Sequence, residues 1–190
     1  MPIKFNLEEL KKKHDCHYYF ETGLWDPRLD DISSKQALNA NFEKVFCMEI
    51  RQDWVYLANI IFKKQIKENK YFLFHEDSSK MKDYLDDSVL DKRSMFFLDA
   101  HVDNANIHNY QKKCPLFDEL NAIKSLERKD HIILIDDLRI IKCHFPWGEQ
   151  SYGDIDFLQQ IKNLILEINP DYKFNTLEGY IPDDVLIAYV

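Results

Sequence analysis

Two stretches decide the fold: Met95-Phe-Phe-Leu-Asp-Ala-His101 and His131-Ile-Ile-Leu-Ile-Asp-Asp137. Each begins with a short apolar run of the length expected for a buried strand, and each continues into carboxylates. The segment 115–126 between them has helical spacing, and Pro115 suits the first turn of a helix. A strand, a helix and a second strand in this order indicate a parallel βαβ unit.

The same alternation continues toward the N-terminus. Strands are predicted at 16–23, 45–50 and 71–74, and helices at 7–14, 34–40, 53–69 and 79–90. Five apolar strands that alternate with helices predict a parallel sheet covered by helices on both faces.

The C-terminal part has a different pattern. A helix is predicted at 155–168, ending before Pro170, and two last strands are predicted at 172–177 and 185–190. Their connection is too short for a crossover, so this final pair is expected to be antiparallel. The sequence therefore predicts an α/β fold, with one doubly wound domain over residues 1–190 that contains a seven-stranded sheet and closes in an antiparallel hairpin.

Composition limits the classes of partner. The chain has 190 residues, of which 45% are hydrophobic and 31% charged, and 25 Lys and Arg against 33 Asp and Glu give a net charge of −8. An acidic balance disfavours nucleic acid and anionic membranes as partners. No apolar run reaches the roughly 18 residues of a spanning helix, and the first residues lack the apolar stretch of a signal peptide. We therefore expect an intracellular, cytoplasmic protein. The four scattered cysteines predict neither a zinc site nor a disulfide framework.

Every predicted parallel strand ends in or beside a carboxylate. These residues are Glu21, Glu49, Asp77, Asp99 and the pair Asp136-Asp137. The carboxyl ends of parallel strands meet at one edge of the sheet, which is where ligands bind in open α/β folds. Acids also cap helices and favour turns, so a structural role for any single one remains an alternative.

These acids have chemical uses at such an edge. An acid at the end of the second strand, here Glu49, can accept hydrogen bonds from the hydroxyls of a ribose. Asp99, Asp136 and Asp137 belong to strands expected to be neighbours, and clustered carboxylates favour a hard divalent cation with oxygen ligands. The sequence therefore predicts a nucleotide-type ligand beside a metal site.

With these motifs in this order, the sequence resembles the class I S-adenosylmethionine-dependent methyltransferases over nearly the whole chain, including their Rossmann-like seven-stranded sheet. Leu98-Asp99-Ala100-His101 and Ile135-Asp136-Asp137 resemble the magnesium-dependent O-methyltransferases within that superfamily. The run Cys114-Pro-Leu-Phe-Asp-Glu-Leu120 is similar to the macrocin O-methyltransferase-like group, which methylates sugar hydroxyls. The resemblance implies S-adenosylmethionine and Mg²⁺ as cofactors.

The resemblance also implies which residues bind the cofactor. They lie at the ends of the first four strands: Glu21, Gly23, Glu49, Asp77, Ser78 and Asp99. Glu21 and Gly23 would lie beside the methionine moiety, and Glu49 would hold the ribose. Asp77 and Ser78 would face the adenine.

Metal and catalytic roles follow in the same way. Mg²⁺ would be bound by Asp99, Asp136 and Asp137, and Asp99 and His101 would be catalytic. His101 stands where related sugar methyltransferases tend to carry an acidic base, and a histidine titrates in the range that a general base needs. A histidine tied into its loop, or one that supports Asp99, is the alternative for His101.

Four residues are candidates for contact with the substrate. Arg139, just past the metal pair, can meet an anionic acceptor such as a nucleotide-linked sugar, or pair with a nearby acid instead. His108, His144 and Trp147 fall in predicted loops, and Trp147 can stack on a sugar face. Packing in a homodimer would explain the tryptophan equally well.

One loop departs from the resembling family. In the methyltransferases that the sequence resembles, this loop has an acid followed by three alternating glycines. Here it reads Glu21-Thr-Gly23-Leu-Trp25-Asp-Pro27, so two of the three glycines are replaced.

The leading hypothesis is a methyltransferase acting on a hydroxyl of a small molecule, most readily a sugar or nucleotide-sugar. The alternatives are a methyltransferase-like binding or assembly module that has lost its cofactor, and a sugar- or nucleotide-binding protein with only a structural cation. The retained acids favour the enzyme, whereas Trp25 and Pro27 favour the alternatives.

Overall fold

The computed structural model describes residues 3–87, 90–100, 114–142 and 155–190. The strands are β1 (Tyr18–Thr22), β2 (Lys44–Glu49), β3 (Tyr71–His75), β4 (Ser94–Leu98), β5 (Ile132–Ile135), β6 (Lys173–Leu177) and β7 (Val185–Tyr189). The helices are α1 (Leu7–Lys13), α2 (Ser33–Asn39), α3 (Gln52–Ile61), α4 (Lys63–Lys67), the 3-10 helix η1 (Ser78–Asp83), α5 (Leu116–Ser125), α6 (Leu138–Ile141) and α8 (Phe157–Ile168).

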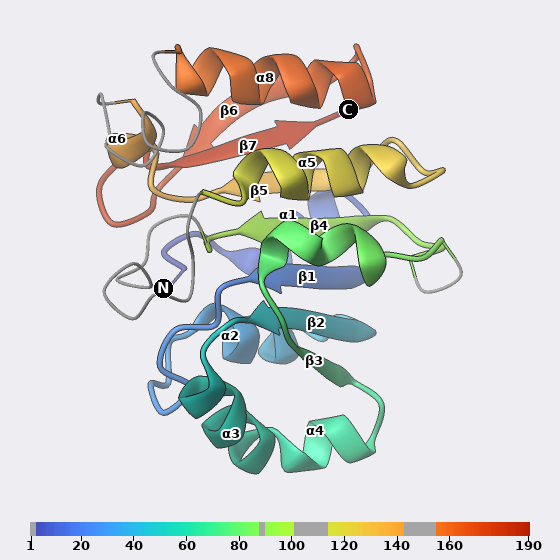
Figure 1. Cartoon of the computed structure of the whole chain (residues 1–190), viewed down its shortest axis with the longest axis vertical. Coiled ribbons are helices and arrows are strands. Elements are labelled where there is room, and N and C mark those ends of the chain that lie inside the picture. Colours follow the sequence, from blue (N-terminus) through green and yellow to red (C-terminus); the bar gives the residue numbers. More distant parts are fainter. Residues whose placement is uncertain (1–2, 88–89, 101–113, 143–154) are drawn as a thin grey trace.

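The strands form one seven-stranded sheet in the order β3-β2-β1-β4-β5-β7-β6, which runs across Figure 1 from bottom to top. Strands β1 to β5 are parallel, and β7 is antiparallel to both β5 and β6. The predicted fold class, a doubly wound α/β sheet with an antiparallel C-terminal hairpin, is confirmed. The strand order reverses between β1 and β4, so the place where such folds bind ligands is the carboxyl edge beside these two strands.

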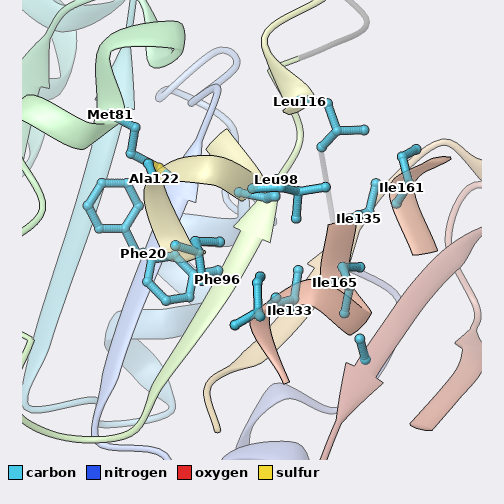
Figure 2. Packing of buried hydrophobic residues seen from close by; sticks show 14 of the residues in the cluster. Phe20, Met81, Phe96, Leu98, Leu116, Ala122, Ile133, Ile135, Ile161 and Ile165 are labelled. Atoms are coloured by element: carbon cyan, nitrogen blue, oxygen red, sulfur yellow. The ribbon is translucent and has the colours of Figure 1, made fainter. Parts of the chain in front are cut away.

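Strand residues alternate between two hydrophobic clusters, one on each face of the sheet. In β4, Phe96 and Leu98 belong to one cluster, and Met95 and Phe97 belong to the other. This alternation follows the two-residue period of a strand buried on both faces. The first cluster joins the sheet to η1, α5 and α8, and Figure 2 shows its packing through residues that include Phe20, Met81, Phe96, Leu116, Ala122, Ile161 and Ile165. The second cluster joins the sheet to α1, α2, α3 and α4.

The helices differ from expectation in three places. The helix predicted at 53–69 is divided into α3 and α4 at Phe62, which is buried and packs against the Tyr71 ring at 4.5 Å between centroids. The helix predicted at 79–90 is only the short η1, because Asp86 and Asp87 are weak helix formers and the Asp87 carboxylate accepts a hydrogen bond from the Glu127 N–H at 2.8 Å. The short helix α6 has no counterpart in the prediction.

The parallel strands β1 to β5 all point their carboxyl ends toward the same side of the molecule, the left in Figure 1. The predicted acidic residues therefore meet along one edge, because each follows or ends one of these strands. Within the described ranges, none of the helices has both the length and the apolar character needed to cross a membrane.

Candidate functional site

Glu21, near the end of β1, is fully buried on the face covered by α2. Its carboxylate accepts hydrogen bonds from the hydroxyls of Ser33 and Ser34, and the Ser34 hydroxyl lies 2.8 Å from the Tyr71 hydroxyl. Burial raises the pKa of Glu21 to about 6, and the two serine hydroxyls oppose that rise. Both oxygens are thus used to join β1 to α2, and the role of Glu21 beside a cofactor stays a prediction.

Gly23 directly follows β1 and has φ of +82°. A Cβ at this position would lie 3.0 Å from the carbonyl oxygen of Asp99 and 3.2 Å from the Cα of Ala100. The first loop therefore presses against the backbone at the end of β4, and only glycine combines this backbone conformation with this close approach. The packing of β1 against β4 at the reversal of strand order accounts for Gly23.

Trp25 occupies the position of the second glycine in the loop of the resembling family and has φ of +63°. A tryptophan in the left-handed region is strained. Its ring packs on Trp54 at 5.3 Å between centroids, and the Arg51 guanidinium lies 3.6 Å from the Trp54 ring centre. The loop thus keeps a conformation typical of glycine at this position, and the edge-to-face contact of Trp25 with Trp54 stabilises it.

Glu49 ends β2 and is 3% exposed. Its carboxylate accepts hydrogen bonds from the Leu24 N–H at 2.8 Å and from the Arg51 N–H at 2.7 Å. Each carboxylate oxygen can accept more than one hydrogen bond. Asp77 has a comparable local role, since its side chain accepts from the Ser79 N–H at 2.9 Å and caps η1.

Ser78 and Glu119 form a polar site that the sequence analysis did not identify as a pair. Glu119, on α5, is fully buried, and burial raises its pKa to about 7. The hydroxyls of Ser78 and Thr22 face it closely enough to lower that pKa, but no donor in the described parts of the chain reaches either oxygen with ordinary hydrogen-bond geometry. The signal was present in the sequence, because Glu119 lies on the same helical stripe as Leu116, Leu120 and Ile123.

At the other half of the edge, Asp136, Asp137 and Asp184 are buried, and one carboxylate oxygen from each lies within 4.8 Å of the others. Burial raises the pKa of Asp136 well above its usual range, and the charges of Asp99 and Asp137 raise it further. Burial and Asp99 likewise raise the pKa of Asp137. The predicted trio of Asp99, Asp136 and Asp137 therefore lies close together, and Asp184, just before β7, is a member that the sequence analysis missed.

Arg139 partly compensates this acidic cluster. Its guanidinium lies 2.5 Å from an oxygen of Asp137 and also pairs with Asp184, while its backbone N–H donates to Asp184 at 2.8 Å. The Tyr180 ring centre lies 4.9 Å from the same guanidinium. Pairing with nearby acids, one of the two roles considered for Arg139, is therefore observed. Its role toward an anionic substrate stays a prediction.

The turn between β6 and β7 closes one side of the acidic cluster. A Cβ on Gly179 would lie 2.9 Å from the Cβ of Asp184 and 3.3 Å from an oxygen of Asp136. Asp137 has φ of +62°, a conformation that aspartate tolerates better than most residues. Four carboxylates supply only oxygen ligands and repel one another around one arginine, so this donor set fits a hard divalent cation such as Mg²⁺.

Four predicted site residues lie outside the described residues: His101, His108, His144 and Trp147. Their roles as base and as substrate contacts stay predictions.

No family model matches the sequence, and no curated protein matches it. Solved structures share its fold. A Staphylococcus aureus protein described as a caffeoyl-CoA O-methyltransferase aligns with 96% of this chain and 80% of its own, at 16% identity and a TM-score of 0.58. The O-methyltransferase TomG of Streptomyces achromogenes, in complex with SAM, aligns with 97% of this chain and 77% of its own, at 14% identity and a TM-score of 0.55. A Bacillus cereus O-methyltransferase in complex with SAH aligns with 97% of this chain and 78% of its own, at 12% identity and a TM-score of 0.54.

At these identities the similarity is one of fold. The shared fold extends over nearly the full length of this chain. The chain therefore has the fold of the O-methyltransferases to which it is similar.

Proposed function

We propose that this protein is an S-adenosylmethionine- and Mg²⁺-dependent O-methyltransferase that methylates a hydroxyl of a small molecule, a sugar or nucleotide-sugar. The observation that carries the proposal is the buried cluster of Asp136, Asp137 and Asp184 beside Asp99, at the same sheet edge as Glu49. An acidic cluster that Arg139 compensates only in part, next to a ribose-type acceptor, suits a metal-assisted reaction of a nucleotide cofactor. The fold shared with O-methyltransferases supports it.

For the cofactor, the proposed contacts divide by strand. Glu49 would accept the ribose hydroxyls, since its oxygens already point between the first loop and β2. Ser78 and Asp77 would face the adenine, and the buried Ser78 hydroxyl has no hydrogen-bond partner among the described residues. The loop around Glu21 and Gly23, with Asp99 across from it, would hold the methionine moiety.

For the metal, Asp99, Asp136 and Asp137 would supply the ligands, with Asp184 beside them. Bound there, Mg²⁺ would lower the pKa of an acceptor hydroxyl and fix its orientation. His101, two residues after Asp99, would take the hydroxyl proton. Methyl transfer is a direct displacement, so the remaining work of the chain is alignment of the two reactants.

For the acceptor, we assign contacts to residues that follow β4 and β5. Arg139 would meet an anionic group of the acceptor, and Trp147 would stack on its ring. His108 and His144 complete the proposed substrate contacts. A homodimer would supply further contacts from a second copy.

A methyltransferase-like binding module is the second candidate. It is favoured by the first loop, where Trp25 and Pro27 replace glycines and where both oxygens of Glu21 are already bound by Ser33 and Ser34. In that case the acidic cluster would hold a cation without turnover.

Calorimetric titration separates the two candidates. The full chain is titrated with S-adenosylmethionine and S-adenosylhomocysteine, with Mg²⁺ and then with EDTA, and nucleotide-sugars are screened for methyl transfer. Micromolar binding of either compound and transfer to an acceptor are expected. If neither compound binds, with or without Mg²⁺ and candidate acceptors, the methyltransferase proposal is wrong and the binding module takes its place.

A further inference from the structure

The buried face of α5 carries an acid where the packing calls for an apolar residue. Leu116, Leu120 and Ile123 of this helix are fully buried in the cluster that faces the sheet, and Glu119 lies on the same stripe with no exposed surface. Figure 2 shows Ala122 of this helix beside Met81 of η1, and Leu116 near Leu98 at the end of β4. An apolar residue would fill such a position without cost, so the carboxyl calls for a chemical explanation.

The groups around Glu119 do not satisfy it. In the part of the chain that the structure describes, neither of its oxygens has a hydrogen-bond partner, and the Ser78 hydroxyl has none either. Thr22 and Ser78 face the carboxyl with hydroxyls, and the largest charge effects on its pKa come from Asp77 and Asp118, which both raise it. A buried acceptor without a donor is rare in folded proteins and destabilises them, so a donor from outside the chain is expected here.

The place of these groups connects them to the ligand edge. Thr22 is the last residue of β1 and its hydroxyl accepts from the Asp99 N–H at 3.3 Å, while Ser78 begins η1 after β3. Glu119 reaches the same corner from the first turn of α5. This corner lies at the carboxyl ends of β1 and β3, apart from the acidic cluster that follows β5 and precedes β7.

The chemistry of the corner selects among the donors of the proposed cofactor. The ribose hydroxyls belong with Glu49, and the amino acid moiety belongs with the first loop. The remaining donor is the exocyclic amino group of adenine, which offers two N–H bonds to a carboxyl acceptor. Ser78 is the residue assigned to the adenine, and it lies next to Glu119.

We propose that Glu119 accepts hydrogen bonds from the exocyclic amino group of the adenine of the cofactor, and so selects adenine over bases with a carbonyl oxygen at that position. This inference rests on the proposed function. Glu119 is then a specificity residue, and Thr22 and Ser78 orient its carboxyl.

The test compares two ligands on the full-length protein. S-adenosylhomocysteine carries the amino group, and S-inosylhomocysteine carries a carbonyl oxygen in its place. At a pH above the pKa of about 7, where Glu119 is ionised, the wild type is expected to bind the adenine compound about 10- to 100-fold more tightly, the range for a hydrogen bond to a charged group. In Glu119→Gln the amide can also donate to the carbonyl oxygen, so the preference is expected to fall to within about threefold. Asp118→Asn, the neighbouring acid, is the matched control and is expected to keep the wild-type preference.

The outcomes separate this inference from the proposed function. If the wild type binds both ligands equally, or if Glu119→Gln keeps the full preference, the role of Glu119 is wrong while cofactor binding stands. If the wild type binds neither ligand, the proposed function is wrong and the inference with it. The wild-type comparison decides the matter even if Glu119→Gln does not fold, which thermal unfolding of the variant would reveal.

Discussion

The two halves of the carboxyl edge use the same type of residue in opposite ways. In the half formed by β1, β2 and β3, acids are satisfied by the protein itself: Glu21 by two serine hydroxyls, Glu49 by two backbone N–H groups, and Asp77 by one. These carboxylates hold loops and a helix end in place.

In the half formed by β4, β5 and β7, the acids face one another. Asp99 raises the pKa of both Asp136 and Asp137, and Arg139 pairs with two of the four carboxylates in this part of the structure. The difference teaches that an acid at a strand end is not by itself a ligand site. What distinguishes the second half is that its carboxylates lie close enough for their charges to raise the pKa of Asp136 and Asp137, even though Arg139 pairs with Asp137 and Asp184.

The largest effect is expected from Asp136→Asn, in the half of the edge formed by β4, β5 and β7, where the carboxylates repel one another. Loss of a ligand should abolish Mg²⁺ binding and lower turnover at least about 100-fold, whereas the metal-free protein should unfold at the same or a higher temperature because a repulsive charge is gone. Calorimetry, methyl-transfer rates and thermal unfolding measure the three quantities. Asp183→Asn, an exposed acid of the same turn, is the control. Unchanged turnover and Mg²⁺ binding in Asp136→Asn would remove the metal from the mechanism.

Glu49→Ala tests the half of the edge formed by β1, β2 and β3, where the acids accept hydrogen bonds from the protein itself. It leaves the Leu24 and Arg51 N–H groups without their acceptor, so the free energy of unfolding should fall by about 2 kcal/mol. Glu49→Gln, which keeps one oxygen acceptor, should lose about half as much. Urea unfolding measures both variants. A loss below about 0.5 kcal/mol in Glu49→Ala would show that the loop does not depend on this carboxylate.

A pH series sharpens the contrast between a satisfied and an unsatisfied buried acid. The pKa of Glu119 in the folded chain, about 7, lies above its value of 4.5 in the unfolded chain, so the folded state holds a proton that the unfolded state releases. The stabilisation is present below pH 4.5 and is lost as the pH rises through 7. Relative to Glu119→Gln, the free energy of unfolding of the wild type should therefore fall by about 3 kcal/mol between pH 4.5 and 7.5.

Glu21→Gln is the matched comparison, because the pKa of Glu21 is raised only to about 6 by the same burial. The difference in free energy of unfolding between Glu21→Gln and the wild type should change less with pH and should level off nearer pH 6. Urea unfolding across the series gives both differences. A difference between wild type and Glu119→Gln that is flat with pH would show that Glu119 is ionised in the folded protein throughout this range.

The smallest effect is expected from Trp25→Gly in the first loop. Glycine relieves the strain at φ of +63° but loses the packing on Trp54, so the two changes should cancel to within about 1 kcal/mol. Trp54→Ala loses the packing without relieving the strain, and should destabilise the protein more. If Trp25→Gly is as damaging as Trp54→Ala, the left-handed conformation at this position carries no strain.

Several features follow from the sequence alone because they depend on local pattern. The apolar runs that become β1, β2, β3, β4 and β5 and the short connection before the final strand predict the parallel sheet and its antiparallel hairpin. Acids placed at the strand ends predict a polar ligand edge, since parallel strands bring those ends together. The close approach of Asp99, Asp136 and Asp137 could be predicted for the same reason.

Tertiary structure decided the rest. Asp184 joins Asp136 only because β7 pairs with β5 in one register, and no local pattern specifies which residue of the last turn that register brings to the cluster. The left-handed conformation of Trp25 depends on a partner ring that lies 29 positions away in the sequence, at Trp54. The sequence places Glu119 on the apolar stripe of its helix, but only the packing of α5 shows that it faces the Ser78 and Thr22 hydroxyls without a hydrogen bond of ordinary geometry. Local sequence thus determines where carboxylates occur, whereas pairing across long sequence separations determines which of them accept hydrogen bonds from the fold and which face one another.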